Sequence, residues 1–207
     1  MDFAQNVVDR RMFTRAVQFF VFAAAITIVA TIVTYIINPD LKTAVEGLKK
    51  STSSEIHPAT GLDKIWSYFR HNGLAVPFQM FILALIPIPF LYLLNVVSTS
   101  ALLGVAFGIA LQVDLDLGVK LILSSIPHSI VEIFAYTVLA AALFEMNRAW
   151  RMKIKKLFKK DSVQEQQSLV QGILKTVKIY VVFVIPLIVV AAFLETYLAD
   201  LIFHGVS

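Results

Sequence analysis

The residues best suited to chemistry in this sequence are a histidine and a glutamate inside a long apolar stretch. His128 and Glu132 are four residues apart, so a helix would place them one turn apart on the same face. Pro127 precedes the histidine and has no N–H, which leaves the carbonyl of Leu123 without its usual helical donor. Within a membrane, an ionisable side chain costs about 2.5–3.5 kcal/mol to insert, so both should face the bundle interior or a wet cavity. The pattern predicts a polar, locally distorted site.

Three interpretations of this pair stay open. The two side chains could bond to each other and to polar groups of neighbouring helices, such as Asn72 or Asn95, as interhelical hydrogen bonds. They could instead relay a proton or cation, which a broken second span supports and the absence of an inverted repeat opposes. An enzyme is least favoured, because no His-Glu-x-x-His motif is present and Glu195 is expected near the outer surface. We expect no catalytic residue, no metal site and no cofactor.

The composition places this pair in a membrane protein. Of 207 residues, 58% are apolar and 15% are charged, whereas soluble globular proteins have roughly 45–50% and about 25%. A soluble domain of this size leaves roughly a third of its surface exposed and could not hide so much apolar area. Zero cysteines exclude disulfides and sulfur-ligated metals. We expect an all-α polytopic helical bundle, one domain over 1–207, in the plasma membrane.

Five apolar stretches provide the helices that would hold the site. Their expected bounds are 17–37, 74–94, 96–113, 121–144 and 179–197. About 20 helical residues cross the ~30 Å hydrocarbon core. Four prolines should distort these helices, and the first two should kink or break the second span: Pro87, Pro89, Pro127 and Pro186. Because Asn95 lies at the joint between them, the second and third stretches could also form a re-entrant hairpin that dips in from outside.

Two glycines in the third stretch predict close helix packing. Gly104 and Gly108 form a small-xxx-small pattern, which lets another helix approach. We favour a partner helix within the chain, because five helices offer many internal partners. A homo-oligomer that uses this face is the alternative.

The basic residues indicate the orientation. Most of the 18 Lys and Arg lie in the N-terminal segment and in 145–178, so the positive-inside rule makes both cytoplasmic. Five spans then place the loop 38–73 and the C-terminus outside. The net charge of +4 is thus explained by topology and needs no nucleic acid. The basic residues expected to face anionic lipid headgroups are Arg151, Lys153, Lys155, Lys156, Lys159 and Lys160.

Four features, taken in order, resemble the stage II sporulation protein M family. They are Tyr68-Phe-Arg-His-Asn72, Asn95 followed by Gly104 and Gly108, Ile126-Pro-His-Ser-Ile-Val-Glu-Ile133, and Ala192-Phe-Leu-Glu-Thr-Tyr197. The resemblance covers about Phe13 to Ile202 and implies a multi-pass bacterial plasma-membrane protein with about five spans. It marks as family-like positions Asn72, Asn95, Pro127, His128, Glu132 and Glu195. The family usually has glycine where this chain has Ser129.

The resemblance also implies a function. The named member of the family is implied to act as a membrane scaffold that recruits peptidoglycan-degrading partners during engulfment in sporulation. We therefore expect a non-enzymatic scaffold or assembly protein of the bacterial cell envelope, with membrane or envelope proteins as partners. The alternative is a small-solute, ion or proton transporter or channel that uses His128 and Glu132.

Overall fold

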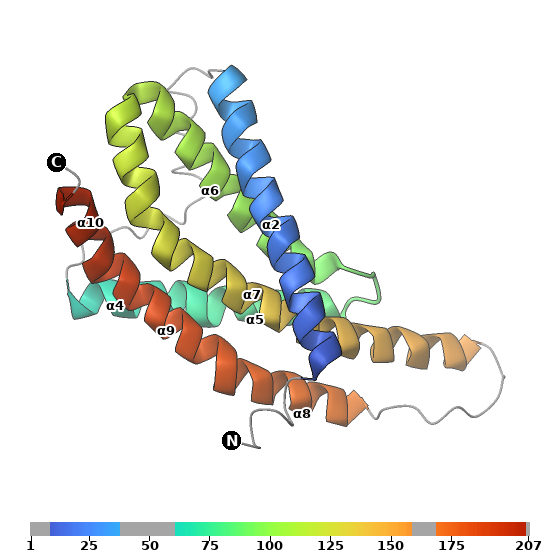
Figure 1. The fold of residues 1–207 in the computed structure, drawn as a ribbon. Helices are drawn as coiled ribbons and strands as arrows, with labels where there is room; N and C mark the ends of the chain where they lie inside the picture. Colours follow the sequence, from blue (N-terminus) through green and yellow to red (C-terminus); the bar gives the residue numbers. More distant parts are fainter. Residues whose placement is uncertain (1–8, 38–60, 159–168, 206–207) are drawn as a thin grey trace.

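The computed structural model describes residues 9–37, 61–158 and 169–205, and their regular structure is entirely helical (Figure 1). The α-helices are α2 (Arg10–Ile37), α4 (Leu62–Tyr68), α5 (Val76–Leu85), α6 (Leu94–Val113), α7 (Leu115–Phe158), α8 (Leu169–Ile179), α9 (Ile185–Phe193) and α10 (Ala199–Gly205). Three π-helical turns and one 3₁₀ turn connect some of them: η1 (Phe69–Ala75), η3 (Tyr180–Val184), η4 (Leu194–Leu198) and η2 (Leu91–Leu93). The all-α class is confirmed.

Four helices of the described residues are long and apolar enough to cross a membrane. They are Arg10–Ile37, Leu91–Val113, Leu115–Lys155 and Val170–Phe203. They contain the first, third, fourth and fifth expected stretches, and each extends beyond the expected bounds. The chain is therefore a multi-pass helical membrane protein.

The expected second span, 74–94, is broken at its two prolines, as the sequence predicts. The α5 helix ends at Leu85, and the chain turns over 86–90 before helix resumes at Leu91. Two prolines inside this turn have no N–H to continue a helical ladder, and Phe90 reverses the chain in the left-handed region at φ 65°.

A continuous helix begins before that stretch and ends inside it. The elements α4, η1 and α5 follow one another without a gap over 62–85. Hydropathy alone does not reveal this 24-residue helix, because its first half carries Asp63, Lys64 and Arg70. It is the helix that presents the family-like segment around Tyr68 to the rest of the bundle.

The turn over 86–90 lies at the end of the bundle where the basic residues gather, which we call the basic end. Asn147 of α7 donates two hydrogen bonds there, to the carbonyls of Ala84 at 2.8 Å and Ile86 at 2.9 Å. The ring of Phe90 lies 5.7 Å from that of Phe144. This placement does not fit a re-entrant hairpin from outside, whose apex would lie deep in the membrane. Helix 62–85 instead runs from the opposite end, which we call the outer end after the orientation that the positive-inside rule predicts.

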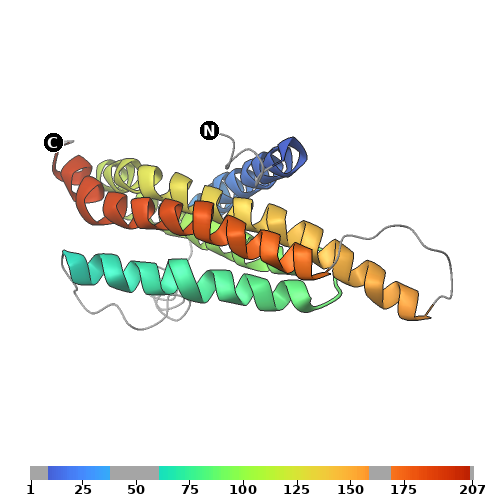
Figure 2. The ribbon, with the colours of Figure 1, turned by 90° about the horizontal axis from the view of Figure 1, so that it is seen from below.

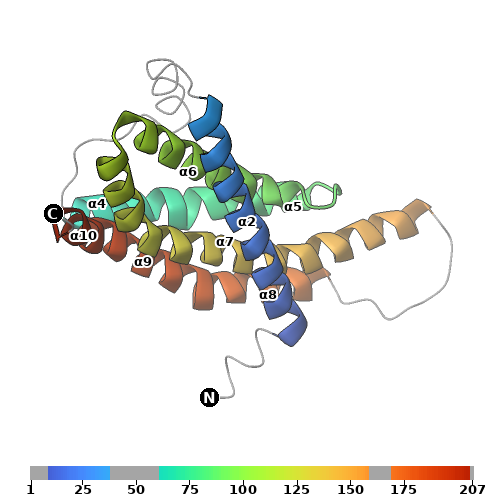
Figure 3. The same ribbon diagram turned by 45° about the horizontal axis from the view of Figure 1, so that its top comes forward.

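Helix 62–85, the second part of α7 and the segment from α8 to α10 lie lengthwise side by side (Figures 1 and 2). The α2 helix crosses α7, and α6 packs against α2 (Figure 3). The 44-residue α7 contains Pro127 and changes direction near it, as a proline inside a helix makes possible (Figure 1). Its first part therefore lies with α6 and its second part with α9.

Gly104 and Gly108 bring α6 against α2. A Cβ on Gly104 would lie 2.3 Å from the carbonyl oxygen of Thr27, and one on Gly108 would lie 2.6 Å from the Cβ of Thr34. The Thr27 hydroxyl also donates to the carbonyl of Ser100 at 3.1 Å. The small-residue face is thus occupied by another helix of the same chain.

A polar cluster at the outer end as the candidate functional site

Polar side chains from three helices meet at the outer end. The α4 helix supplies Lys64 and Tyr68, α7 supplies His128 and Glu132, and η4 supplies Glu195. We call these five residues the outer cluster. Each pair on one helix is four residues apart, so both members lie on the face that meets the other two helices.

Glu195 lies between His128 and Lys64. Its Oε2 is 2.9 Å from Nδ1 of His128, and its Oε1 is 3.4 Å from Nζ of Lys64. Lys64 also donates to the backbone carbonyl of Glu195 at 3.3 Å. The His128 side chain is 12% exposed, whereas those of Lys64 and Glu195 are 35% and 27% exposed. The cluster is therefore open to solvent through Lys64 and Glu195, while His128 lies deeper.

The carboxylate of Glu132 accepts a hydrogen bond from the hydroxyl of Tyr68. His128 makes its close contact with Glu195 instead. The pair that the sequence suggests as mutual partners is thus divided between two neighbouring helices. Two side chains one turn apart can each reach a different helix when α7 lies between those helices.

Two tyrosines near the outer cluster donate hydrogen bonds to backbone carbonyls of η1. Pro77 has no N–H for the carbonyls four and five residues before it, which are those of Gly73 and Asn72. The Tyr180 hydroxyl donates to the Gly73 carbonyl at 2.5 Å, and the Tyr136 hydroxyl donates to the Asn72 carbonyl at 3.2 Å. Tyrosines on two other helices therefore satisfy the carbonyls that the proline leaves open.

The expected site residues do not all gather here. Asn72 contributes its carbonyl, and Glu195 joins the cluster directly. Asn95 lies elsewhere, since its amide donates to Gln79 Oε1 at 3.1 Å and to the carbonyl of Val76 at 3.4 Å. It is therefore a contact between α6 and α5, because the start of α6 follows the turn at the basic end.

The sequence analysis did not identify Lys64 and Tyr68 as members of the cluster. It also did not identify Pro77 as the residue that frees a backbone carbonyl. A signal for Lys64 and Tyr68 existed, because Lys64, Tyr68 and Asn72 follow one another at intervals of four residues, which places them on one face of a helix. The signal for Pro77 was the carbonyl that a proline inside a helix leaves without its backbone donor. Pro186 stands at the start of α9, directly after the π-helical turn η3.

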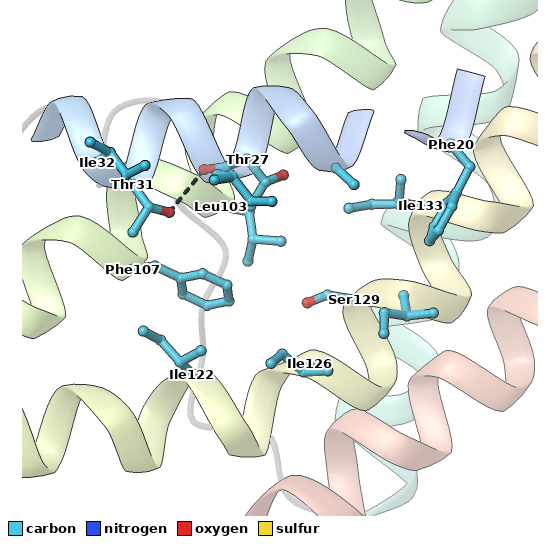
Figure 4. A pocket seen from close by; sticks show the side chains of 13 residues that line it. Phe20, Thr27, Thr31, Ile32, Leu103, Phe107, Ile122, Ile126, Ser129 and Ile133 are labelled. Carbon is cyan, nitrogen blue, oxygen red and sulfur yellow. Dashed lines mark hydrogen bonds between the residues drawn. The ribbon is translucent and has the colours of Figure 1, made fainter. Parts of the chain in front are cut away.

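A separate cavity of about 440 Å³ lies between α2, α6 and α7. Figure 4 shows Ser129 beside it, with Phe107 and Ile126 on one side and Phe20 and Ile133 on the other. Two threonines line it, and both hydroxyls donate to backbone carbonyls: Thr31 to Thr27 at 2.8 Å and Thr27 to Ser100 at 3.1 Å. Neither hydroxyl is therefore aimed at a ligand. The cavity is thus apolar and unsuited to a charged substrate.

A second ionic cluster lies at the basic end. Glu145 Oε1 is 3.4 Å from Nη1 of Arg15, and its Oε2 is 2.9 Å from Nζ of Lys175. Lys175 also lies 3.2 Å from Oδ2 of Asp9, whose Oδ1 accepts the backbone N–H of Met12 at 2.7 Å. That backbone hydrogen bond, followed by the contact with Lys175, holds the pKa of Asp9 below its usual value. Asp9 thus caps α2 and links it to α8.

The remaining basic residues are partly described. Nε of Arg151 donates to Oδ1 of Asn147 at 3.0 Å, so this arginine is engaged within α7. The side chains of Lys153 and Lys155 are exposed. The Lys156 side chain, Lys159 and Lys160 lie outside the described residues. Within the described ranges, no three His, Cys, Asp or Glu side chains lie close enough to hold a metal ion.

The helices, their length and their apolarity define a multi-pass membrane protein with a polar cluster at one end and an ionic cluster at the other. A comparison with protein families identifies the family within this class. The family model described as stage II sporulation protein M matches residues 16–200, so the chain belongs to this family. No curated protein and no solved structure matches the chain.

Proposed function

We propose that this protein is a non-enzymatic scaffold or assembly component in the plasma membrane of a bacterium, and that it positions envelope proteins from its outer end. Its membership of the stage II sporulation protein M family supports this proposal. Peptidoglycan-degrading enzymes are the class of partner that the family resemblance implies.

One observation favours a scaffold over a transporter. Helix 62–85, the second part of α7 and the segment from α8 to α10 each have an uncharged stretch between the outer cluster and the basic end. On α7, no carboxylate, histidine or basic residue lies between Glu132 and Glu145. The residues of its middle part, from Val138 to Leu143, are all buried. No charged residue occurs in 72–85 or in 179–194 of the two flanking helices. A proton or cation path along this bundle would have to cross that apolar layer.

The contacts of the outer cluster also favour a structural role. Each joins a different pair of elements: Tyr68 and Glu132 join α4 to α7, His128 and Glu195 join α7 to η4, and Lys64 and Glu195 join α4 to η4. Such a closed set of links fixes three helices relative to one another. A fixed outer end is what a platform for partner proteins requires.

The outer end also carries exposed apolar side chains that suit a partner or the membrane surface. On α4, Leu62 is 75% exposed and Trp66 is 61% exposed. The Trp66 ring stacks on Phe69, with centroids 5.9 Å apart, which holds it at the helix surface. Aromatic rings of this kind gather at membrane–water interfaces and at protein interfaces.

A photo-crosslinking residue in place of Trp66 tests the scaffold in cells. We expect a discrete protein adduct that contains a peptidoglycan-degrading enzyme. The matched control places the same residue at Val190 of α9, which is 49% exposed within the apolar part of its helix and should yield lipid adducts only. Equal protein adducts at both positions, or none at Trp66, would contradict the proposal.

Flux measurements in reconstituted vesicles test the alternative, which the part-exposed outer cluster favours. We expect wild-type protein to conduct protons and cations no faster than the Glu132→Gln variant, because the same uncharged layer of the bundle blocks a path in both proteins. Flux in the wild type that disappears in Glu132→Gln, with an unchanged yield of folded protein, would replace the scaffold with a transporter.

A further inference from the structure

The basic end holds a polar cavity of about 310 Å³ between the start of α2, α7 and α8. Its wall contains cations, acids and apolar groups together. The residues that line it are Asp9, Arg11, Arg15, Phe144, Glu145, Arg148, Ala149, Met152 and Lys175. Neither the outer cluster nor the proposed scaffold function uses this cavity.

The acids of the cavity are already paired. Glu145 contacts both Arg15 and Lys175, and Asp9 contacts Lys175 and the first turn of α2. These four side chains form one ionic group with no excess charge. Arg15 is held further by Phe144, because its guanidinium carbon lies 4.0 Å from the centre of that ring.

Two arginines of the cavity remain. Within the part of the chain that the structure describes, the side chains of Arg11 and Arg148 make no hydrogen bond or ion pair, and both are exposed. The lining therefore carries an excess of two positive charges from two guanidinium groups. Guanidinium groups present paired N–H donors that match the oxygens of a phosphate.

We propose that this cavity binds the phosphate of an anionic phospholipid, through Arg11 and Arg148. The apolar part of the wall favours a lipid over a free phosphate, since Ala149 and Met152 offer contact to a glycerol or acyl group. The cavity also lies beside the first residues of the membrane-crossing α2, where lipid phosphates are found. Basic pockets between membrane helices on the cytoplasmic side bind headgroups in this way.

Native mass spectrometry of the full chain, loaded with phosphatidylglycerol in detergent, tests the site. We expect Arg11→Gln with Arg148→Gln to lower the affinity for the first bound lipid about tenfold, because two charge-assisted hydrogen bonds are lost. The matched control, Lys153→Gln with Lys155→Gln, removes two exposed charges from the same end outside the cavity. It should change that affinity by less than about threefold.

Two outcomes would overturn the proposal. One is an equal loss of lipid in the arginine and lysine variants, which would mean attraction to the surface charge alone. The other is displacement of the lipid by millimolar inorganic phosphate, which would mean that the site takes a free anion. If the double arginine variant does not fold, Arg148→Lys keeps the charge and should still weaken lipid binding, since a lysine lacks the paired donors of an arginine.

Discussion

His128 Nδ1 lies 2.9 Å from Glu195 Oε2, and this contact joins the first part of α7 to the last part of the C-terminal membrane helix. The two residues are far apart in the sequence, so the contact forms only when α7 and η4 are docked. Glu195 also contacts the partly exposed Lys64, so the two contacts connect the more deeply placed His128 to the solvent-accessible side of the outer cluster.

A double-mutant cycle measures this contact. We expect His128→Gln and Glu195→Gln to couple by about 0.5–3 kcal/mol in the free energy of unfolding, as contacting residues do. Thermal unfolding in detergent provides the readout. The control cycle pairs His128→Gln with Asp200→Asn on α10, an exposed acid, and should show no coupling. Equal coupling in the two cycles would mean that charge, rather than the contact, is responsible.

Tyr68→Phe should destabilise the protein by about 1–3 kcal/mol, because it removes a hydroxyl that donates to the Glu132 carboxylate. The same unfolding measurement applies. Tyr197→Phe removes a hydroxyl from a side chain that is 53% exposed, and it should have little effect. If the two variants behave alike, the Tyr68–Glu132 bond is not a stabilising link.

Gly104→Ala should destabilise the protein by about 1–3 kcal/mol, because the added Cβ would lie 2.3 Å from a backbone oxygen of α2 and must push the helices apart. Gly205→Ala is the control, since a Cβ there meets no atom within 4 Å. Alanine is the better helix former, so the control should be neutral or slightly stabilising. A stabilised Gly104→Ala would show that α2 and α6 are not in close contact.

Single cysteines can test the topology without background, because the chain has none. Five crossings predict that a membrane-impermeant maleimide labels Ile88→Cys from the cytoplasmic side. They also predict that Leu62→Cys and Leu201→Cys are labelled from the outside. All three side chains are at least half exposed. Labelling of Ile88→Cys from the outside would restore the re-entrant hairpin.

Asp9 predicts a pH dependence of stability. Its pKa is lowered in the folded protein, so its contribution is present above the ordinary aspartate pKa and is lost as pH falls through the lowered value. Asp9→Asn keeps an acceptor for the α2 cap but has no charge, so its unfolding should lack this acid-dependent loss. Unfolding of both proteins between neutral and acid pH, compared at matched salt, measures the difference. Identical pH profiles would exclude a contribution from Asp9.

The sequence alone indicated most of the helices and part of the site. Runs without charge predicted four of the spans, because apolarity is a local property of the chain. The break at Pro87 and Pro89 could be predicted from the prolines. The start of the helix before it could not, because Asp63, Lys64 and Arg70 hide that part from a search for apolar runs. Glu132 and His128 could be found from their spacing. Their partners could not, because Tyr68 and Glu195 reach them only through the packing of separate helices.

The π-helical turn η1 sets the rotation of α4 about the helix axis relative to α5. Each residue of an α-helix turns the chain by about 100°, so the wide turn over Phe69–Ala75 shifts everything before it relative to α5. Loss of one residue within that turn would leave α5 packed as it is and rotate Lys64 and Tyr68 away from α7. The chain length of this one turn therefore decides whether the outer cluster can assemble at all.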